Sequence, residues 1–397
     1  MRTTIGLGTR AAAGAGAIVL AVFGLATGAQ AAPPEAAVQA VPGAEVVPDS
    51  YIVVLKSGKT ARTVAGRHET RVLHAYTKAL NGFAATMTAR KARQLAADPD
   101  VAFVQPNVIH RISDTQTNPP SYGLDRIDQR NRPLNQAYTY NTTASNVHAY
   151  IIDTGIRTSH QDFGGRATSG FDAIDGGAAD DCNGHGTHVA GTVGGTSYGV
   201  AKGVQLVAVR VLNCDGSGTT AQVAAGIDWV TANAAKPAVA NMSLGGSADT
   251  ALDNAVRNSI TSGVTYAIAA GNGLFGIFAL DACTQSPARV TQAITVSATN
   301  SSDAKPSWAN RGTCVDVFAP GISITSAWYT NNTATNTISG TSMAAPHVAG
   351  AAALYLANNT GATPAQVQTA VVNNATTGVV TSPGSGSPNR LLYTGAF

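Results

Sequence analysis

Short apolar runs alternate with helical patterns along the second part of the chain. Six runs rich in Val, Ile and Ala fit strands, at 148–152, 204–211, 238–242, 264–269, 293–297 and 315–319. Such runs are typical of parallel strands buried on both faces. The stretches 185–196, 219–234, 248–262 and 340–358 fit helices. The alternation predicts an α/β fold with a doubly wound, mainly parallel sheet, whose sites gather at the carboxyl ends of the strands.

A different pattern precedes this one. Strand-like segments lie at 50–56, 72–76, 82–87 and 101–104, and helical segments at 60–68 and 88–97. Thr88 can cap the second helix, which ends before Pro99. The order strand, helix, strand, strand, helix, strand predicts a small α+β, ferredoxin-like domain.

The N-terminus fits an export signal. Arg2 and Arg10 flank the start of the apolar stretch 11–28, and Ala29-Gln30-Ala31 is a small-x-small cleavage site. A membrane anchor is the alternative, but the stretch is short, rich in Gly and Ala, and followed by Pro33-Pro34. We therefore expect a signal peptide at 1–31 and a secreted, extracellular product with no membrane span.

Charge is distributed unevenly, and this supports a division into parts. Residues 1–113 carry 12 Lys+Arg and 6 Asp+Glu, a net charge of +6. Residues 114–397 carry the other 13 Lys+Arg and the other 16 acidic residues, a net charge of −3. A basic leader on a mildly acidic domain is no sign of nucleic-acid binding. We expect a signal peptide at 1–31, a prosegment at 32–113 that folds from about residue 50, and a catalytic domain at 114–397.

The four cysteines, at 182, 214, 283 and 314, all lie in the acidic part. Export permits disulfides, and three pairings are open by arithmetic alone. Four free thiols fit an exported protein poorly, and no CxxC pair supports a zinc site.

Three segments carry residues suited to nucleophilic catalysis. Asp153 ends an apolar strand before a Gly turn, His185 stands between two glycines at a helix start, and Ser342 opens an Ala- and Gly-rich helix. Asp153 alone would equally fit a cap or a satisfied core carboxylate. Together the three supply a base-orienting group, a general base and a nucleophile. We place Pro346 in the first helical turn, where amide hydrogens lack partners.

The segments around these residues resemble the signature blocks of the subtilisin-like serine peptidases (subtilase superfamily). They read DTG from Asp153, HGTHVAG from His185 and GTSMAAPHVAG from Gly340. The order Asp, His, Ser excludes an α/β-hydrolase. The match runs from about residue 114 to the end and is most similar to the proteinase K branch, while 50–112 resembles the family's inhibitory prosegment.

The resemblance implies a zymogen of a serine endopeptidase that forms an acyl-enzyme and matures by autocatalytic cleavage near 113–116. Its partners would be peptide substrates and its own prosegment, with no nucleic acid or membrane, and it would be a monomer. Asn272 would be the oxyanion donor. The substrate-binding residues would be Gly216, Ser217, Ser243, Leu244, Gly245, Gly246, Ala269, Ala270 and Gly271. Their small side chains would line a wide, uncharged pocket, which implies broad specificity that favours apolar or aromatic P1 residues.

The resemblance also implies two disulfides and structural calcium, with no organic cofactor. The bridges would be Cys182–Cys214 and Cys283–Cys314. The first calcium site would use Thr291 and Ala293 carbonyls with Asp316, although Asp316 could be a mere strand-end cap. A second site would use Asp125, Asp128 and Gln129. It would bind calcium more weakly, because Asn135 stands where some relatives have Asp. His188 and His347 would be structural.

One segment departs from the family pattern. Residues 273–280 are strongly apolar and about five residues longer than in relatives, beside the oxyanion and P1 residues. The insertion leaves open an inactive binding protein of the same fold. A serine esterase or lipase is the other alternative, opposed by the chain order and by the missing G-x-S-x-G elbow.

Overall fold

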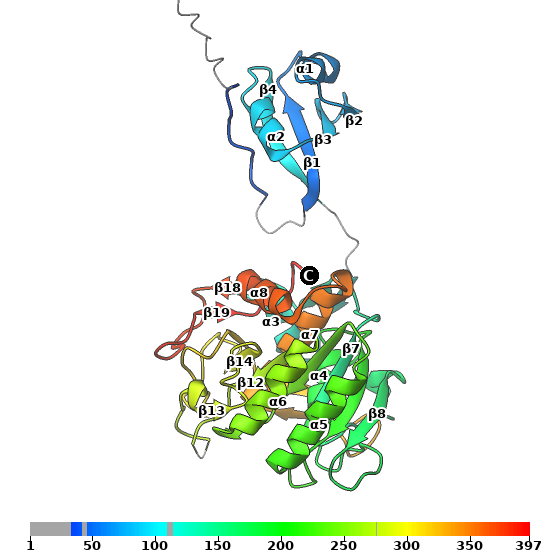
Figure 1. Ribbon diagram of the computed structural model, residues 1–397, viewed down its shortest axis with the longest axis vertical. Helices are drawn as coiled ribbons and strands as arrows, with labels where there is room; N and C mark the ends of the chain where they lie inside the picture. The colour runs from blue at the N-terminus through cyan, green and yellow to red at the C-terminus, as the bar shows by residue number, and fades with distance from the viewer. Residues whose placement is uncertain (1–32, 42–45, 109–113, 275) are drawn as a thin grey trace, which may run out of the picture. The chain divides into compact units, whose positions relative to one another are not determined.

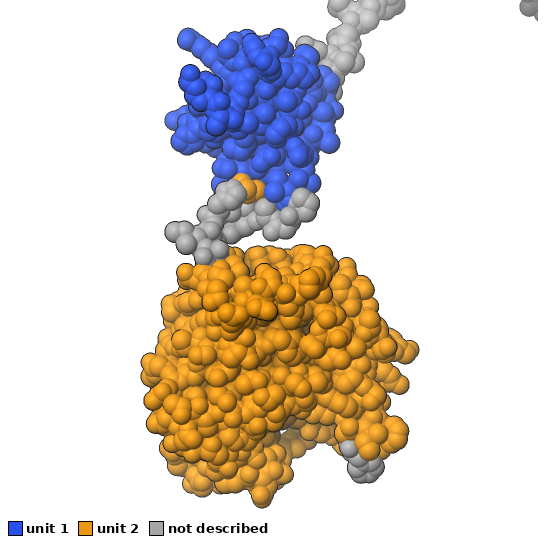
Figure 2. Space-filling model, turned by 180° about the vertical axis from the view of Figure 1, so that it is seen from behind, with its two compact units in different colours: residues 1–41, 46–107 blue, residues 42–45, 108–397 orange. Residues whose placement is uncertain are grey.

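The computed structural model describes residues 33–41, 46–108, 114–274 and 276–397. These residues form two compact units, drawn in separate colours in Figure 2 and described here one at a time. The predicted signal peptide at 1–31 and the predicted boundary at residue 113 lie outside the described residues. Among the helices that are described, none is both long and apolar enough to span a bilayer.

The first unit is a four-stranded sheet with two helices. Its elements are β1 (Val46–Leu55), α1 (Ala61–Arg67), β2 (Val72–Tyr76), β3 (Gly82–Thr86), α2 (Ala89–Ala96) and β4 (Val101–Val108). The strand order β2-β3-β1-β4 is that of the predicted ferredoxin-like fold. Thr60 and Thr88 cap the two helices with their hydroxyls, as local sequence predicts for Thr88.

The second unit is built on a nine-stranded sheet (Figure 1). Its strands are β7 (His148–Asp153), β8 (Ala167–Asp172), β9 (Gln205–Arg210), β10 (Ala238–Met242), β12 (Thr265–Ala269), β14 (Ile294–Thr299), β15 (Val317–Pro320), β18 (Thr376–Thr377) and β19 (Arg390–Leu391). The order is β18-β19-β15-β14-β12-β10-β7-β9-β8, and only the β18–β19 pair is antiparallel. The predicted doubly wound, mainly parallel sheet is confirmed.

Helices cover both faces of this sheet. The helices are α3 (Tyr122–Ile127), α4 (His185–Gly194), α5 (Thr220–Asn233), α6 (Thr250–Thr261), α7 (Thr341–Asn358) and α8 (Pro364–Asn374), with 3₁₀ turns at Gln161–Phe163 and Ala282–Thr284. The apolar residues of α4, α7 and α8 share one buried cluster, and those of α5 and α6 share another. Three strand pairs lie apart from the main sheet: β5 (Asp114–Thr117) with β6 (Ala137–Tyr140), β11 (Gly246–Ser247) with β13 (Gln285–Ser286), and β16 (Ile324–Ala327) with β17 (Thr335–Ile338).

The strand order reverses at β7, and this reversal locates the site. The chain runs from β7 to β9 on one side and then returns to β10 on the other. Open α/β sheets place their sites at such a switch point, outside the carboxyl ends of the strands. Here Asp153 ends β7, and Ser243 directly follows β10.

The prediction for Pro346 is wrong. Helix α7 begins at Thr341, so Pro346 is its sixth residue and lies in the second turn. A proline there removes the amide hydrogen that would bond the carbonyl oxygen four residues earlier, which belongs to Ser342.

Candidate active site

Asp153 and His185 form a buried ion-pair geometry at the end of β7. Asp153 is fully buried, and its Oδ1 lies 2.8 Å from Nδ1 of His185, whose side chain is 26% exposed. Burial lowers the pKa of His185, but the neighbouring Asp153 charge and hydrogen bond outweigh it and leave that pKa raised. The carboxylate therefore fixes the ring orientation and favours the imidazolium.

The start of α4 is held by a residue that sequence reasoning missed. Asp181 accepts hydrogen bonds from the backbone N–H groups of Asn183, Gly184 and Thr187, and from the hydroxyl of Thr154 beside Asp153. Gly184 has φ +110°, and a Cβ there would lie 2.5 Å from the Trp328 ring. The Asp-x-x-Gly-His spacing was the available signal, because Asp is a strong helix-capping residue.

Ser342 is the second residue of α7, where the helix N-terminus favours developing negative charge. Its hydroxyl donates to the carbonyl oxygen of Ser243 at 3.1 Å. Within the described residues no hydrogen bond joins this hydroxyl to His185. A hydroxyl rotates freely about its bond, and catalytic hydrogen bonds are often long before substrate binds.

Asn272 is fixed by its oxygen. Its Oδ1 accepts from the backbone N–H of Thr341 at 2.9 Å and from the Thr341 hydroxyl at 2.8 Å. The amide oxygen is thus directed at the start of α7. Nδ2 is left to face the space over Gly340, where a Cβ would lie 3.4 Å from it. The arrangement presents an N–H donor next to Ser342.

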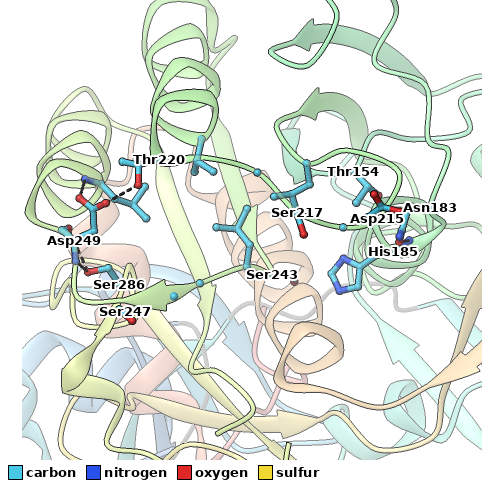
Figure 3. Close-up of a pocket in the computed structure, with 18 of the residues that line it drawn as sticks. Thr154, Asn183, His185, Asp215, Ser217, Thr220, Ser243, Ser247, Asp249 and Ser286 are labelled. Carbon is cyan, nitrogen blue, oxygen red and sulfur yellow. Dashed lines mark hydrogen bonds between the residues drawn. The ribbon is translucent and has the colours of Figure 1, made fainter. Parts of the chain in front are cut away.

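Two adjoining cavities are lined by His185, Asn272, Ser342 and all nine predicted substrate-binding residues. One, of about 780 Å³, is lined by His185, by Gly216 and Ser217, and by residues 243–246 (Figure 3). The other, of about 520 Å³, is lined by 243–246, by Ala269 to Asn272, and by Ser342. Because residues 243–247 line both, the cavities form one cleft that runs past the imidazole and the serine.

Family comparisons agree with this geometry. A model described as "Subtilase family" matches residues 145–391, and one described as "Peptidase inhibitor I9" matches residues 50–113.

The chain belongs to the subtilase family.

Its relatives cover both parts of this subtilase. It is 52% identical over 394 residues to an extracellular serine proteinase of Thermus sp. (strain Rt41A), across 91% of this chain and 94% of the relative. It is 50% identical over 336 residues to alkaline serine exoprotease A of Vibrio alginolyticus, across 83% of this chain and 61% of the relative. The crystal structure of a cold adapted subtilisin-like serine proteinase, 55% identical, matches with a TM-score of 0.66 over 69% of this chain and 97% of that one. This subtilase is therefore a serine proteinase with an inhibitor-type prosegment domain.

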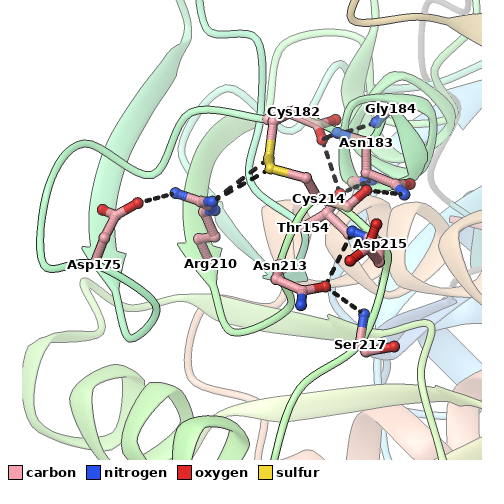
Figure 4. Close-up of a disulfide and its surroundings, with 12 residues drawn as sticks. Thr154, Asp175, Cys182, Asn183, Gly184, Arg210, Asn213, Cys214, Asp215 and Ser217 are labelled. Carbon is pink, nitrogen blue, oxygen red and sulfur yellow. Dashed lines mark hydrogen bonds and ion pairs between the residues drawn. A yellow bond between two sulfur atoms is a disulfide. The ribbon is translucent and has the colours of Figure 1, made fainter.

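The cysteines of this subtilase form two disulfides, Cys182–Cys214 and Cys283–Cys314. The first joins the segment before His185 to the segment before Gly216 (Figure 4). The Asn183 amide reinforces this link by donating to the carbonyl oxygen of Cys214 at 2.9 Å. The bridge therefore ties the imidazole-bearing helix start to one wall of the cleft.

The apolar insertion forms a small closed turn beside the second cavity. Leu274 and Phe278 exchange backbone hydrogen bonds of 2.8 and 3.2 Å. Leu274 and Leu280 line the cavity, whereas Ile277 does not and is 57% exposed. The described residues of the insertion border the cavity without filling it, so the cavity beside Asn272 is open.

Buried Asn310, another residue that sequence reasoning missed, anchors the insertion to the pocket. Its Oδ1 accepts from the N–H of Leu280 at 2.8 Å, and its Nδ2 donates to the carbonyl oxygen of Ala270 at 2.7 Å. Its own N–H donates to the carbonyl oxygen of Gly271. These three bonds tie the end of the insertion to the cavity wall at Ala270 and Gly271.

The second predicted calcium site has one feature that fits a cation. Both carboxylate oxygens of Asp125 accept hydrogen bonds, from the backbone N–H groups of Asn135 and Gln136. Asp128 uses only Oδ2, on the N–H of Thr139, and its buried Oδ1 has no partner among the described residues. Burial, with the nearby Asp125 charge, raises the pKa of Asp128 to about 6. An unpaired carboxylate oxygen is a hard ligand of the kind calcium prefers.

The residues of the first predicted calcium site lie together, but a side-chain amide occupies the space between them. Thr291, Ala293 and Asp316 lie together at the amino ends of β14 and β15, and burial raises the pKa of Asp316 to about 6. The side chain of Gln368 from α8 projects among their oxygens, with Nε2 3.0 Å from Thr291 O and 2.9 Å from Ala293 O. These oxygens, as arranged here, do not fit a cation.

Proposed function

We propose that this subtilase is a secreted endopeptidase that cleaves peptide bonds through an acyl-enzyme, with Asp153, His185 and Ser342 as its catalytic triad. Ser342 Oγ attacks the peptide carbonyl carbon while His185 accepts its proton. Collapse of the tetrahedral intermediate breaks the C–N bond, and His185 returns the proton to the leaving amine. Water, deprotonated by the same imidazole, then releases the acyl group. The observation that carries the proposal is the 2.8 Å Asp153–His185 contact beside the cleft that also holds Ser342.

Asn272 stabilises the oxyanion in this proposal. Its oxygen is occupied by Thr341, so its Nδ2 and the N–H of Ser342 are the donors available to the developing charge. Loss of one such donor costs about 10²–10³ in kcat in subtilisins.

We assign broad specificity with a preference for apolar and aromatic P1 side chains. The pocket walls are Gly and Ala backbone, with Leu274 and Leu280 at the insertion side and no charged side chain. The substrate backbone lies extended between the Gly216 and Ser243 segments. Its binding then depends mainly on backbone hydrogen bonds, which discriminate little between side chains. An Arg or Lys preference in a panel of P1-varied peptides would contradict this assignment.

Maturation is proposed to be autocatalytic, with the prosegment as intramolecular inhibitor. Asp114–Thr117 already pairs with Ala137–Tyr140 inside the catalytic unit, and the Gln116 amide donates to Ser197 O. Cleavage before Asp114 keeps this pair intact, so we place the cut at the start of the 113–116 window. Export by the signal at 1–31 precedes it, and the mature enzyme acts as a monomer.

We also propose that calcium binds at Asp125, Asp128 and Gln129, where it would stabilise the mature N-terminal region without taking part in the chemistry. The unpaired Oδ1 of Asp128 supports this assignment.

The decisive experiment is casein hydrolysis by the secreted product, with and without phenylmethylsulfonyl fluoride. We expect hydrolysis that the reagent abolishes, and a Ser342→Ala variant that accumulates uncleaved proform. Efficient self-processing of Ser342→Ala, or hydrolysis that resists the reagent, would reject the assignment of Ser342 as nucleophile. A product that cleaves simple esters but not casein would favour the esterase alternative.

A further inference from the structure

Three oxygen atoms converge on one amide group at the amino ends of β14 and β15. They are the carbonyl oxygens of Thr291 and Ala293 and the carboxylate of Asp316. The amide belongs to Gln368, in the middle of α8, a helix that the capping box of Thr363 and Gln366 starts firmly. The helix packs against α7 and β12, so the position of Gln368 is set by the fold rather than by a free loop.

The chemistry of the contacts fixes which end of the amide faces the oxygens. Nε2 donates to Thr291 O at 3.0 Å and to Ala293 O at 2.9 Å, and the same side chain acts to lower the pKa of the neighbouring Asp316 against the larger effect of burial. If the amide were reversed, Oε1 would face the two carbonyl acceptors with no hydrogen between them. The nitrogen therefore occupies the centre of the cluster, with its two hydrogens toward the oxygens.

A calcium ion needs the same centre. Calcium takes six to eight oxygens at about 2.3–2.6 Å, and carbonyl and carboxylate oxygens are its usual protein ligands. An amide nitrogen is not a ligand for it, and an N–H at hydrogen-bond distance leaves no space for the ion. The Gln368 amide and a cation are thus alternative occupants of one site.

We propose that in this subtilase Gln368 replaces the calcium ion at the Thr291–Ala293–Asp316 cluster, so that the chain itself satisfies these oxygens and the site is closed to calcium. The partial positive charge of the N–H groups does what a cation would do, tying the loop before β14 and the start of β15 to α8. Calcium can enter only when the Gln368 side chain leaves, which breaks both carbonyl contacts. The enzyme therefore keeps this part of the fold without relying on calcium.

The test compares variants at position 368 in the mature enzyme, blocked with phenylmethylsulfonyl fluoride to prevent autolysis. Gln368→Ala removes the amide, and Gln368→Glu replaces it with a further oxygen ligand. Thr369→Ala is the matched control, because Thr369 is exposed on the same helix and its hydroxyl bonds only Ala365 O. Thermal unfolding is followed after treatment with EDTA and again in millimolar calcium chloride. The Asp128 site is present in all four proteins, so its contribution cancels between them.

We expect the same calcium-induced rise in Tm for wild type and Thr369→Ala, a larger rise for Gln368→Ala and the largest for Gln368→Glu. The rise in Gln368→Glu should exceed that of wild type by about 5 °C, as expected for a site filled well above its dissociation constant. In EDTA both position-368 variants should melt below wild type. Adding Asp316→Asn should remove the extra rise from Gln368→Glu and leave the wild-type rise unchanged.

The opposite pattern would overturn the proposal. That pattern is a wild-type rise that Asp316→Asn reduces, with Gln368→Ala and Gln368→Glu gaining no more than wild type. If Gln368→Glu does not fold, terbium titration of Gln368→Ala and wild type makes the same comparison. Tighter terbium binding by the Ala variant supports the proposal, and equal binding rejects it.

Discussion

Ser243 and Ser342 exchange two hydrogen bonds, although 99 residues separate them in the chain. The Ser243 hydroxyl donates to the carbonyl oxygen of Ser342 at 2.8 Å, and the Ser342 hydroxyl donates to the carbonyl oxygen of Ser243 at 3.1 Å. Pro346 explains the first bond, because it withholds the helical N–H that Ser342 O would otherwise receive. The Asn241 amide donates to the Ser243 hydroxyl in turn, at 2.8 Å, and so orients it.

We predict that Ser243→Ala lowers kcat about tenfold and leaves KM nearly unchanged. The variant leaves the partly buried Ser342 carbonyl without this donor, which costs about 1–3 kcal/mol and lets the start of α7 shift. Ser243 is a positioning residue for the nucleophile in this view. Steady-state kinetics on a small peptide substrate would separate the two parameters.

Pro346→Ala provides the control, because it restores a helical N–H four residues after Ser342. We expect the double variant Ser243→Ala/Pro346→Ala to recover part of the lost kcat. If the double variant is no better than Ser243→Ala, or if Ser243→Ala changes only Tm, the positioning role is wrong.

The pH dependence of activity should reflect the Asp153–His185 pair. The proposed base must be neutral, and the pKa of His185 is raised above its ordinary value of 6.5. As pH falls through this raised pKa, the imidazole gains a proton and kcat/KM falls, so the acid limb should lie above pH 6.5. In Asp153→Asn the charge that raises the pKa is gone. The limb should move to lower pH while kcat falls about 10⁴-fold, the order of loss in subtilisins. A pH profile of kcat/KM for both proteins checks this, and an unmoved limb would contradict it.

Much of the fold could be predicted because its signals are local. The runs around β10 and β7 are mostly apolar, and the structure places Ala238–Met242 where the pattern does. Short edge strands such as Thr376–Thr377 gave no comparable signal, because two residues carry no periodicity. Helix α8 does carry a local start signal, because Thr363 and Gln366 form a capping box and Pro364 is its first residue. Its apolar periodicity is weak, because only Val367 and Val371 are buried.

Only the site residues that belong to sequence motifs could be predicted. Asp153, His185, Asn272 and Ser342 stand in motif segments, whereas the exchange between Ser243 and Ser342 depends on the return of β10 beside the start of α7. Likewise Gln368 meets Thr291 from 77 positions away, so no local pattern reveals it. Contacts between distant segments depend on register and packing, which a single sequence does not display.

The apolar insertion should tune P1 selectivity. Leu274 lines the pocket, so Leu274→Ser should lower kcat/KM for Phe or Leu at P1 about tenfold relative to Ala at P1, as expected for a lost apolar contact. Ile277→Ser is the matched control, because Ile277 stands on the same turn but does not line this pocket. A P1 panel measured for both variants and wild type would decide. Equal shifts in the two variants would show that the turn acts through general destabilisation instead.

The structural role of His188 and His347 predicts how stability depends on pH. Both are fully buried, and their rings bond the carbonyl oxygens of Ile324 and Met343. Burial lowers the pKa of each to about 4, and for His188 the charges of His185 and His347 add to this. In the unfolded chain these two histidines titrate near the ordinary value of 6.5, so between pH 6.5 and 4 they bind up to two more protons there than they do in the folded protein.

The stability that these two histidines contribute is therefore fully present above pH 6.5 and is lost as pH falls toward 4, whereas the pKa values of Asp128 and Asp316, raised to about 6, give slopes of the opposite sign. Each histidine contributes about 1.4 kcal/mol per pH unit to the slope of the unfolding free energy in this window. Urea unfolding of the inhibitor-blocked enzyme at several pH values measures the total slope, and the slope of His347→Gln should differ from that of wild type by one histidine's share. The comparison uses slopes, so a uniform destabilisation by the substitution does not matter. A slope that is unchanged in His347→Gln would mean that His347 carries a proton in the folded enzyme and has a role beyond packing.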